Sequence, residues 1–167
     1  MCIRDREAFV RKSAELRRVT RELLDKNPAQ YGRFSERVIE IIRRFEEGQL
    51  AAADGLRDFE NLTSDIQAEK GAHSDLGMDE HTFSILRIIE AIVPDADASA
   101  MQDAATGIGA IYADAAATQP AFTHMEDYLR SLRQQTRRIL TEHGIGETKI
   151  IREKVEDFAI HTFGDGA

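Results

Sequence analysis

The spacing of apolar residues constrains the fold of this chain more than any other feature. From Glu7 almost to the last residue, apolar side chains recur three and four positions apart, as they do on one face of an α-helix. No segment alternates apolar and polar residues for more than a few positions, as a half-buried strand would. We therefore predict an all-α protein without a sheet, in which about seven helices pack as an irregular helical bundle.

Cap and break residues predict where the first helices begin and end. Asn27 and Pro28 together start a helix, because Asn caps free backbone N–H groups and Pro fits the first helical position. The apolar residues of this helix are spaced like a coiled-coil seam: Tyr31, Phe34, Val38, Ile41 and Phe45. The preceding helix is expected over residues 7–24. The following helix is expected to end near Lys70, and residues 71–77 are predicted to form a loop.

Two more helices are predicted in the middle of the chain. Asp79 caps the first, a short and strongly apolar helix that Pro94 ends, and we expect it to be the most buried. The second covers about residues 98–117 and is rich in alanine, with Gly107 and Gly109 near its middle. Each Gly costs about 1 kcal/mol relative to Ala in a helix. Small residues nevertheless let a neighbouring helix approach closely.

The last two helices follow Pro120. Thr123 and Glu126 have the spacing of a capping box, in which each side chain satisfies a free backbone donor at the start of a helix. This helix is expected to end at Gly144. A final helix starts near Glu147, and its predicted buried residues are Ile150, Ile151, Val155, Phe158 and Ala159.

No catalytic or metal-binding motif is recognisable in the sequence. The five histidines are scattered, with no pair three or four positions apart, and no Cys/His cluster has zinc spacing. Gly107 and Gly109 lie in a helical pattern instead of following a strand, so they do not predict a dinucleotide-binding loop. No serine lies in a Gly-x-Ser-x-Gly elbow. We predict no catalytic residue, no metal site and no cofactor in this chain.

Two expected helices carry groups of arginines that could meet an anionic partner. Our candidate partner-facing or phosphate-facing residues are Arg130, Arg133, Arg137 and Arg138. A second group is Arg17, Arg18 and Arg21. Both groups lack interleaved aromatic residues, so they either contact an anion or pair with Glu and Asp at the surface. The chain has 22 Lys and Arg against 30 Asp and Glu, a net charge of −8, which argues against a general binder of polyanions.

The first six residues resemble the translation of a transposon adapter used to prepare sequencing libraries. On this interpretation residues 1–6, including the only cysteine, are foreign, and the native sequence was cut at residue 7. We expect residues 7–167 to form a single helical domain, the C-terminal piece of a longer protein. A single cysteine cannot form an internal disulfide, so we predict a reducing compartment and a cytoplasmic protein. No apolar run approaches the roughly 20 residues that span a bilayer, so we predict no membrane partner.

Three short motifs follow one another along the chain. An Asn-Pro pair, a Tyr and a Phe-Ser-Glu-Arg run comprise Asn27, Pro28, Tyr31, Phe34, Ser35, Glu36 and Arg37. A Leu-Gly-Met-Asp turn before a Phe-containing helix comprises Leu76, Gly77, Met78, Asp79 and Phe83, and a capped basic helix that ends in Gly covers residues 132–144. In order and spacing these motifs resemble the C-terminal helical region of the R subunit of type I restriction enzymes (HsdR), which the third motif matches less strictly. The similarity covers nearly all of residues 7–167, although the Ala-rich segment at 98–117 departs from it.

The resemblance implies that this chain takes part in assembling a type I restriction complex. The parent protein would be a large cytoplasmic DNA translocase and endonuclease that uses ATP and Mg²⁺. Its C-terminal region would dock the motor on the methyltransferase and specificity subunits and meet DNA through that complex. No nuclease or ATPase motif of the family matches a position here, so no catalytic residue is carried over. Two alternatives stay open: a stand-alone helical regulatory or nucleic-acid-binding protein that uses residues 130–138, and a small enzyme with a carboxylate site.

Overall fold

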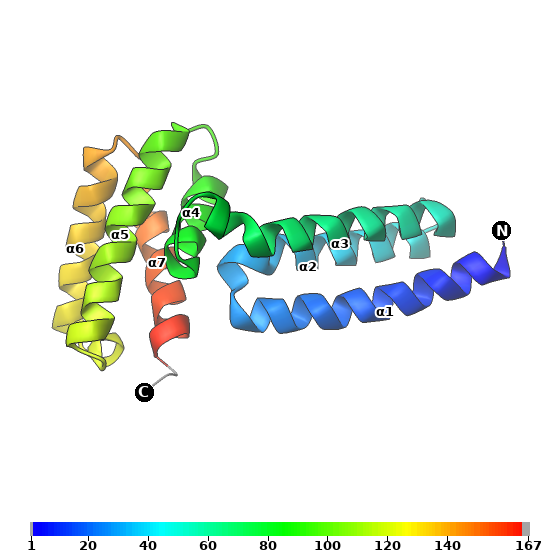
Figure 1. Cartoon of the computed structure of the whole chain (residues 1–167), viewed down its shortest axis with the longest axis horizontal. Coiled ribbons are helices and arrows are strands. Elements are labelled where there is room, and N and C mark those ends of the chain that lie inside the picture. Colours follow the sequence, from blue (N-terminus) through cyan, green and yellow to red (C-terminus); the bar gives the residue numbers. More distant parts are fainter. Residues whose placement is uncertain (1, 165–167) are drawn as a thin grey trace. The chain divides into compact units, whose positions relative to one another are not determined.

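The computed structural model describes residues 2–164, which form seven α-helices and one short 3-10 helix without a strand (Figure 1). The prediction of an all-α bundle is confirmed. The helices are α1 (Ile3–Lys26), α2 (Pro28–Glu46), α3 (Ala52–Asp75), α4 (Glu80–Ile92), α5 (Ala98–Thr118), η1 (Phe122–His124), α6 (Glu126–Glu142) and α7 (Thr148–Phe163). None of the helices in this part of the chain is long and apolar enough to cross a membrane.

The helices belong to two compact units, whereas the sequence analysis expected one domain. Helices α1 to α3 contact one another in the first unit, which ends at Asp75, and α4 to α7 contact one another in the second, which begins at Leu76. Gly77 follows this boundary with a φ of +66°, in the left-handed region that favours glycine and stops a helix. Apolar spacing shows which face of a helix is buried but not which helices share a core, so it could not reveal this division.

Three aromatic rings hold the first unit together. Phe9 of α1 is only 2% exposed. The centroid of its ring lies 4.0 Å from that of Phe45 in α2 and 5.0 Å from that of Phe59 in α3. Gly55 lies beneath the same ring, and a Cβ added there would come within 2.8 Å of Phe9 Cδ2. The missing side chain of Gly55 therefore lets α3 approach α1.

Helix α2 begins as predicted and is fixed to α3 by polar contacts. Asn27 Oδ1 accepts a hydrogen bond from the backbone N–H of Gln30 at 3.1 Å, and Pro28 is the first helical residue. The seam is also confirmed, because Tyr31, Phe34, Val38 and Ile41 are buried and Phe45 packs against the same core. Arg33 pairs with the buried Glu69 at 2.6 Å, and Arg37 pairs with Asp65 at 2.7 Å.

Close helix contacts in the second unit use the two glycines of α5. A Cβ at Gly109 would lie 3.3 Å from Thr82 Cβ in α4, and a Cβ at Gly107 would lie 3.3 Å from Ile139 Cγ2 in α6. The close approach that the sequence predicted for these small residues is confirmed. Asp79 caps α4 by accepting a hydrogen bond from the Thr82 N–H at 2.9 Å, and residues 82–86 are all buried.

Two boundary predictions were wrong. Residues 71–75 continue α3 instead of forming a loop, because a lone Gly such as Gly71 weakens a helix without ending it. Helix α1 begins at Ile3, earlier than the expected start at residue 7, because residues 3–6 include no Gly or Pro that would break a helix.

Two predictions in the last third of the chain were also wrong. Thr123 and Glu126 do not form a capping box, since Thr123 lies in η1 and no side chain caps α6. The physical reason is the complete burial of Phe122. With this side chain in the core, the segment that precedes α6 forms the 3-10 helix η1 instead of an N-cap. Ile150 is 44% exposed, because the buried face of α7 passes through Ile151, Val155 and Phe158.

Candidate partner-binding surfaces

The four arginines proposed as a partner-facing group all lie on α6, but they do not act as one free basic surface. Arg130 lies 3.4 Å from Asp127 in an exposed pair. Arg133 is engaged between two carboxylates. Arg137 and Arg138 are exposed and make no ion pair within residues 2–164. Of the four arginines, only Arg137 and Arg138 therefore remain available to contact a partner, as the sequence suggested for all four.

Arg133 joins α6 to α7. Its Nη2 donates to Glu156 Oε1 at 2.7 Å and its Nε to the other oxygen of that carboxylate, while Nη1 donates to Glu126 Oε1 at 2.8 Å. The hydrogen bonds from Arg133 hold the pKa of Glu126 below its ordinary value, and those same contacts with Glu156 and Glu126 raise the pKa of Arg133. A bidentate arginine of this kind is committed to a carboxylate within the protein. Sequence reasoning missed this because Glu156 lies on another helix.

Replacing Arg133 with alanine is expected to lower the free energy of unfolding by about 1–2 kcal/mol, the worth of hydrogen bonds to a charged group discounted for solvent. The Arg133 and Glu156 side chains are 32% and 15% exposed, so Glu156 would lose a partner that water replaces only in part. Arg130→Ala is the matched control, and its expected effect is close to zero because its pair is solvent-exposed. Urea unfolding followed by circular dichroism measures both. Equal effects at the two positions would contradict the network.

Tyr112 of α5 lies buried near this network. Burial, together with the negative charge of Glu156, raises the pKa of Tyr112 to about 12 from an ordinary value of 10.0. The folded protein therefore favours the neutral phenol more strongly than the unfolded chain does.

This shift predicts a loss of stability at alkaline pH. The contribution of Tyr112 is fully present below pH 10 and is lost as the pH rises from 10 through about 12. The loss amounts to about 2–3 kcal/mol, because each unit of pKa difference is worth about 1.4 kcal/mol. Urea unfolding measured across this pH range should show the decline in the native protein and a flatter profile in Tyr112→Phe. An unchanged profile in the variant would assign the decline to other groups.

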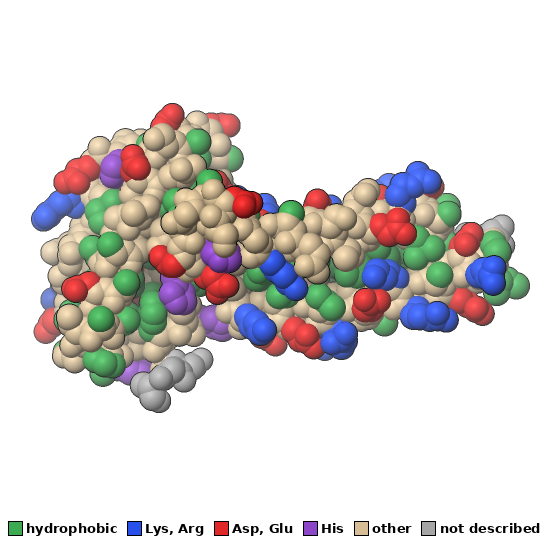
Figure 2. Space-filling view, in the orientation of Figure 1, with side chains coloured by type: hydrophobic (Ala, Val, Ile, Leu, Met, Phe, Trp, Pro, Cys, Tyr) green, Lys and Arg blue, Asp and Glu red, His purple; other side chains and the backbone are tan. Residues whose placement is uncertain are grey.

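The second arginine group borders a groove between α1 and α2 of the first unit. Arg17, Arg18 and Arg21 line this groove, whose volume is about 580 Å³. The other lining residues are Arg6, Phe9, Val10, Ser13, Ala14, Ile42, Phe45 and Glu46. We call this surface the α1/α2 groove. Figure 2 shows Lys and Arg side chains along the first unit, interspersed with Asp and Glu and with hydrophobic side chains between them.

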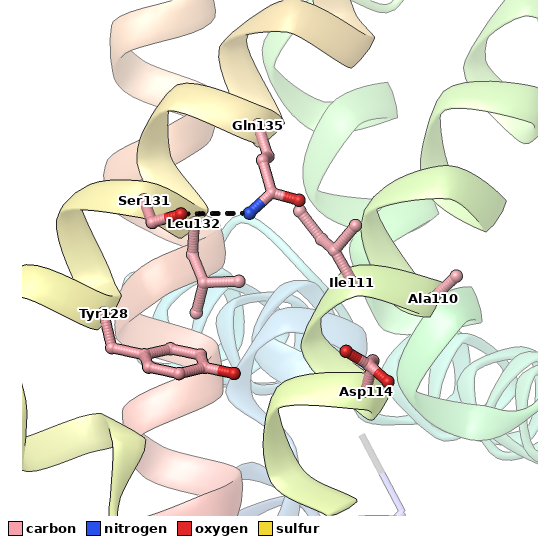
Figure 3. A pocket seen from close by; sticks show the side chains of 7 residues that line it. All are labelled: Ala110, Ile111, Asp114, Tyr128, Ser131, Leu132 and Gln135. Atoms are coloured by element: carbon pink, nitrogen blue, oxygen red, sulfur yellow. Dashed lines mark hydrogen bonds between the residues drawn. The ribbon is translucent and has the colours of Figure 1, made fainter. Parts of the chain in front are cut away.

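A hollow of about 450 Å³ is lined by residues of α5 and α6 in the second unit (Figure 3). The Tyr128 hydroxyl points into it, and Gln135 Nε2 donates to Ser131 Oγ at 3.2 Å. Asp114 adds a carboxylate, while Ala110, Ile111 and Leu132 are apolar. Among the residues that line this hollow, the partner of Ser131 is the Gln135 amide and not a base, so the lining offers hydrogen bonds without an activated nucleophile.

A smaller cavity of about 180 Å³ lies among α4, α5 and α7. Its walls are mainly apolar and include Ile85, Val155, Phe158 and Phe163. His81 lies at its margin, with its ring centroid 5.2 Å from that of Phe163. This cavity could not be predicted from the sequence, because its lining residues come from helices that are far apart in the chain. In the part of the chain that the structure describes, no three His, Cys, Asp or Glu side chains are placed to hold a metal ion.

No family model, curated protein or solved structure matches the chain. The resemblance expected from the sequence therefore rests on the order of its motifs alone.

Proposed function

We propose that this chain is a non-catalytic helical assembly domain like the C-terminal region of a type I restriction enzyme R subunit. In that role it docks a DNA motor and nuclease on the methyltransferase and specificity subunits. The observation that supports the proposal most is that the motif residues build the helical scaffold. Tyr31 and Phe34 are buried in the core of the first unit, and Phe83 is buried in the second.

The polar residues of the same motifs also have scaffold roles. Arg37 links α2 to α3 through Asp65, Gly77 takes a positive φ, and Asp79 caps α4. An enzyme motif would instead bring reactive side chains together at a cavity. The motif residues thus fit a domain that presents helix surfaces to other proteins.

The distribution of charge favours protein partners over DNA. Fourteen Lys and Arg stand against fifteen Asp and Glu in the first unit, and eight stand against fifteen in the second. Arg130 and Arg133, two of the four arginines considered for phosphate binding, are paired with carboxylates. Both facts reduce the electrostatic attraction on which DNA affinity depends. The stand-alone DNA-binding alternative is left with Arg137 and Arg138.

Genomic context and co-purification both test the proposal. If the proposal holds, the native reading frame upstream of residue 7 encodes motor motifs and lies beside methyltransferase and specificity genes. The tagged chain should then capture the methyltransferase–specificity complex at a defined stoichiometry. An authentic start codon near residue 7, or no capture of this complex, would overturn the proposal. Tight binding to a duplex DNA at moderate salt, lost in Arg137→Glu/Arg138→Glu, would favour the DNA-binding alternative.

A further inference from the structure

We propose that the α1/α2 groove is the docking site for an acidic amphipathic helix of a protein partner. The inference rests on the proposed function in one respect, namely that the chain works by binding proteins. It adds the surface that is used and the chemistry of the segment that binds there.

The lining residues of α1 form one continuous stripe. Val10, Ala14, Arg17 and Arg21 follow one another at spacings of four, three and four, so they lie on the same face of the helix. At 1.5 Å per residue, the stretch from Val10 to Arg21 is about 17 Å long. Ile42, Phe45 and Glu46 supply the opposite wall from α2. A groove of this length accepts about three turns of a helix that belongs to the partner protein.

The middle of the groove is apolar and incompletely covered. Phe9 and the wall residue Ile42 are buried, whereas Val10 is 55% exposed. The side chain of Val10 therefore leaves apolar surface in water beside a hydrophobic core. A helix laid in the groove would cover this surface with its own apolar face, which is the usual mode of helix-in-groove recognition.

The charges at the groove specify the polar face of the occupant. Arg17 and Arg21 make no ion pair among the described residues, and Arg18 has only an exposed contact with Glu22 at 3.1 Å. Glu46 is the one carboxylate among the residues that line the groove. Because Phe45 lies beside Phe9, Glu46 is near the far end of the groove from Arg17 and Arg21. Glu and Asp of the partner would therefore gather at the Arg17–Arg21 end.

Arg6 also lines the groove, but it belongs to the six residues expected to be foreign, and none of the proposed contacts depends on it. A nucleic acid fits this surface less well than a helix does. Its phosphates would meet the arginines, but the two aromatic residues that line the groove offer little face on which bases could stack, because Phe9 is buried and Phe45 is partly buried.

Two synthetic helical peptides of about 15 residues test the proposal. Both carry leucines at alternating spacings of three and four, and the remaining positions are Glu in one peptide and Lys in the other. We expect the full chain to bind the Glu peptide in fluorescence anisotropy and to bind the Lys peptide at least about tenfold more weakly. Arg17→Glu/Arg21→Glu should weaken the Glu peptide by at least about tenfold and strengthen the Lys peptide.

Arg11→Glu is the matched control, since Arg11 is an exposed arginine of α1 outside the groove. This variant should bind both peptides as the native chain does. Val10→Ser should weaken the Glu peptide without exchanging the preference between the two peptides. Circular dichroism and urea unfolding establish that every variant is folded.

Several outcomes would overturn the proposal: no binding of the Glu peptide, equal loss in Arg11→Glu and in the double variant, or a preference for a short duplex DNA that the double variant abolishes. Capture of the methyltransferase–specificity complex separates this inference from the proposed function. Capture that the double variant leaves unchanged would reject the groove and keep the assembly function. Binding of the Glu peptide without capture of the complex would reject that function and keep the groove.

Discussion

Phe9→Ala is expected to lower the free energy of unfolding of the first unit by about 3–5 kcal/mol, the usual cost of emptying a buried phenylalanine site. The ring of Phe9 lies between Phe45 of α2 and Phe59 of α3, so its loss removes contacts of α1 with both neighbours. Urea unfolding followed by circular dichroism measures this loss. A loss below about 1 kcal/mol would mean that the ring does not occupy this position.

The same ring makes the outcome of Gly55→Ala depend on Phe9. In the native chain the new Cβ would collide with the ring, so overpacking of about 1–3 kcal/mol outweighs the gain of about 1 kcal/mol in helix propensity. In the Phe9→Ala background the space is empty and the sign should reverse. Gly55→Ala should then stabilise the protein by up to about 1 kcal/mol. This double-mutant cycle isolates the contact between the two residues.

Gly71→Ala provides the control for this cycle. Gly71 lies on the same helix, and a Cβ at this position would meet no atom within 4 Å. The substitution should stabilise the protein by about 0.5–1 kcal/mol in both backgrounds. If Gly55→Ala behaved like Gly71→Ala in the native chain, the close approach of α3 to α1 would be contradicted.

The sequence predicted most of the helices because periodicity reports directly which side of a helix is apolar. The seam from Tyr31 to Phe45 and the cap at Asp79 are local patterns, and both appear in the structure. The contact between Phe9 and Gly55 joins residues on different helices, and no local pattern encodes it. For the same reason, spacing alone could not divide the helices between two cores.

The sequence shows which residue types the candidate surfaces contain. It does not show which of these side chains are already paired within the protein. The arginines of α6 are visible in the sequence, yet the carboxylate that engages Arg133 is 23 residues away on α7. On α1 the reverse holds, since the stripe from Val10 through Arg17 to Arg21 could have been found from its helical spacing. Its opposite wall, with Ile42 and Phe45, required knowledge of how α2 folds back on α1.

Phe122→Ala should lower the free energy of unfolding of the second unit by about 3–5 kcal/mol, because Phe122 is completely buried. Its ring centroid lies 6.2 Å from that of Tyr112 in α5 and 5.9 Å from that of Phe163 in α7. It also lies 6.3 Å from the ring of Tyr128 in α6. A residue of a three-residue 3-10 helix thus contacts three long helices. Urea unfolding followed by near-ultraviolet circular dichroism should report the loss of this aromatic cluster.

Thr123→Ala distinguishes this packing role from the capping box that the sequence predicted. If the Thr123 hydroxyl capped α6, its removal would cost about 1 kcal/mol and would shorten the helix. In the structure no side chain caps α6, so the only expected cost is that of a trimmed side chain, below about 1 kcal/mol. The helical circular dichroism signal of the folded variant decides between the accounts. An unchanged signal in Thr123→Ala means that the segment before α6 is fixed by the buried ring of Phe122, whereas a smaller signal, from a shortened α6, would restore the cap.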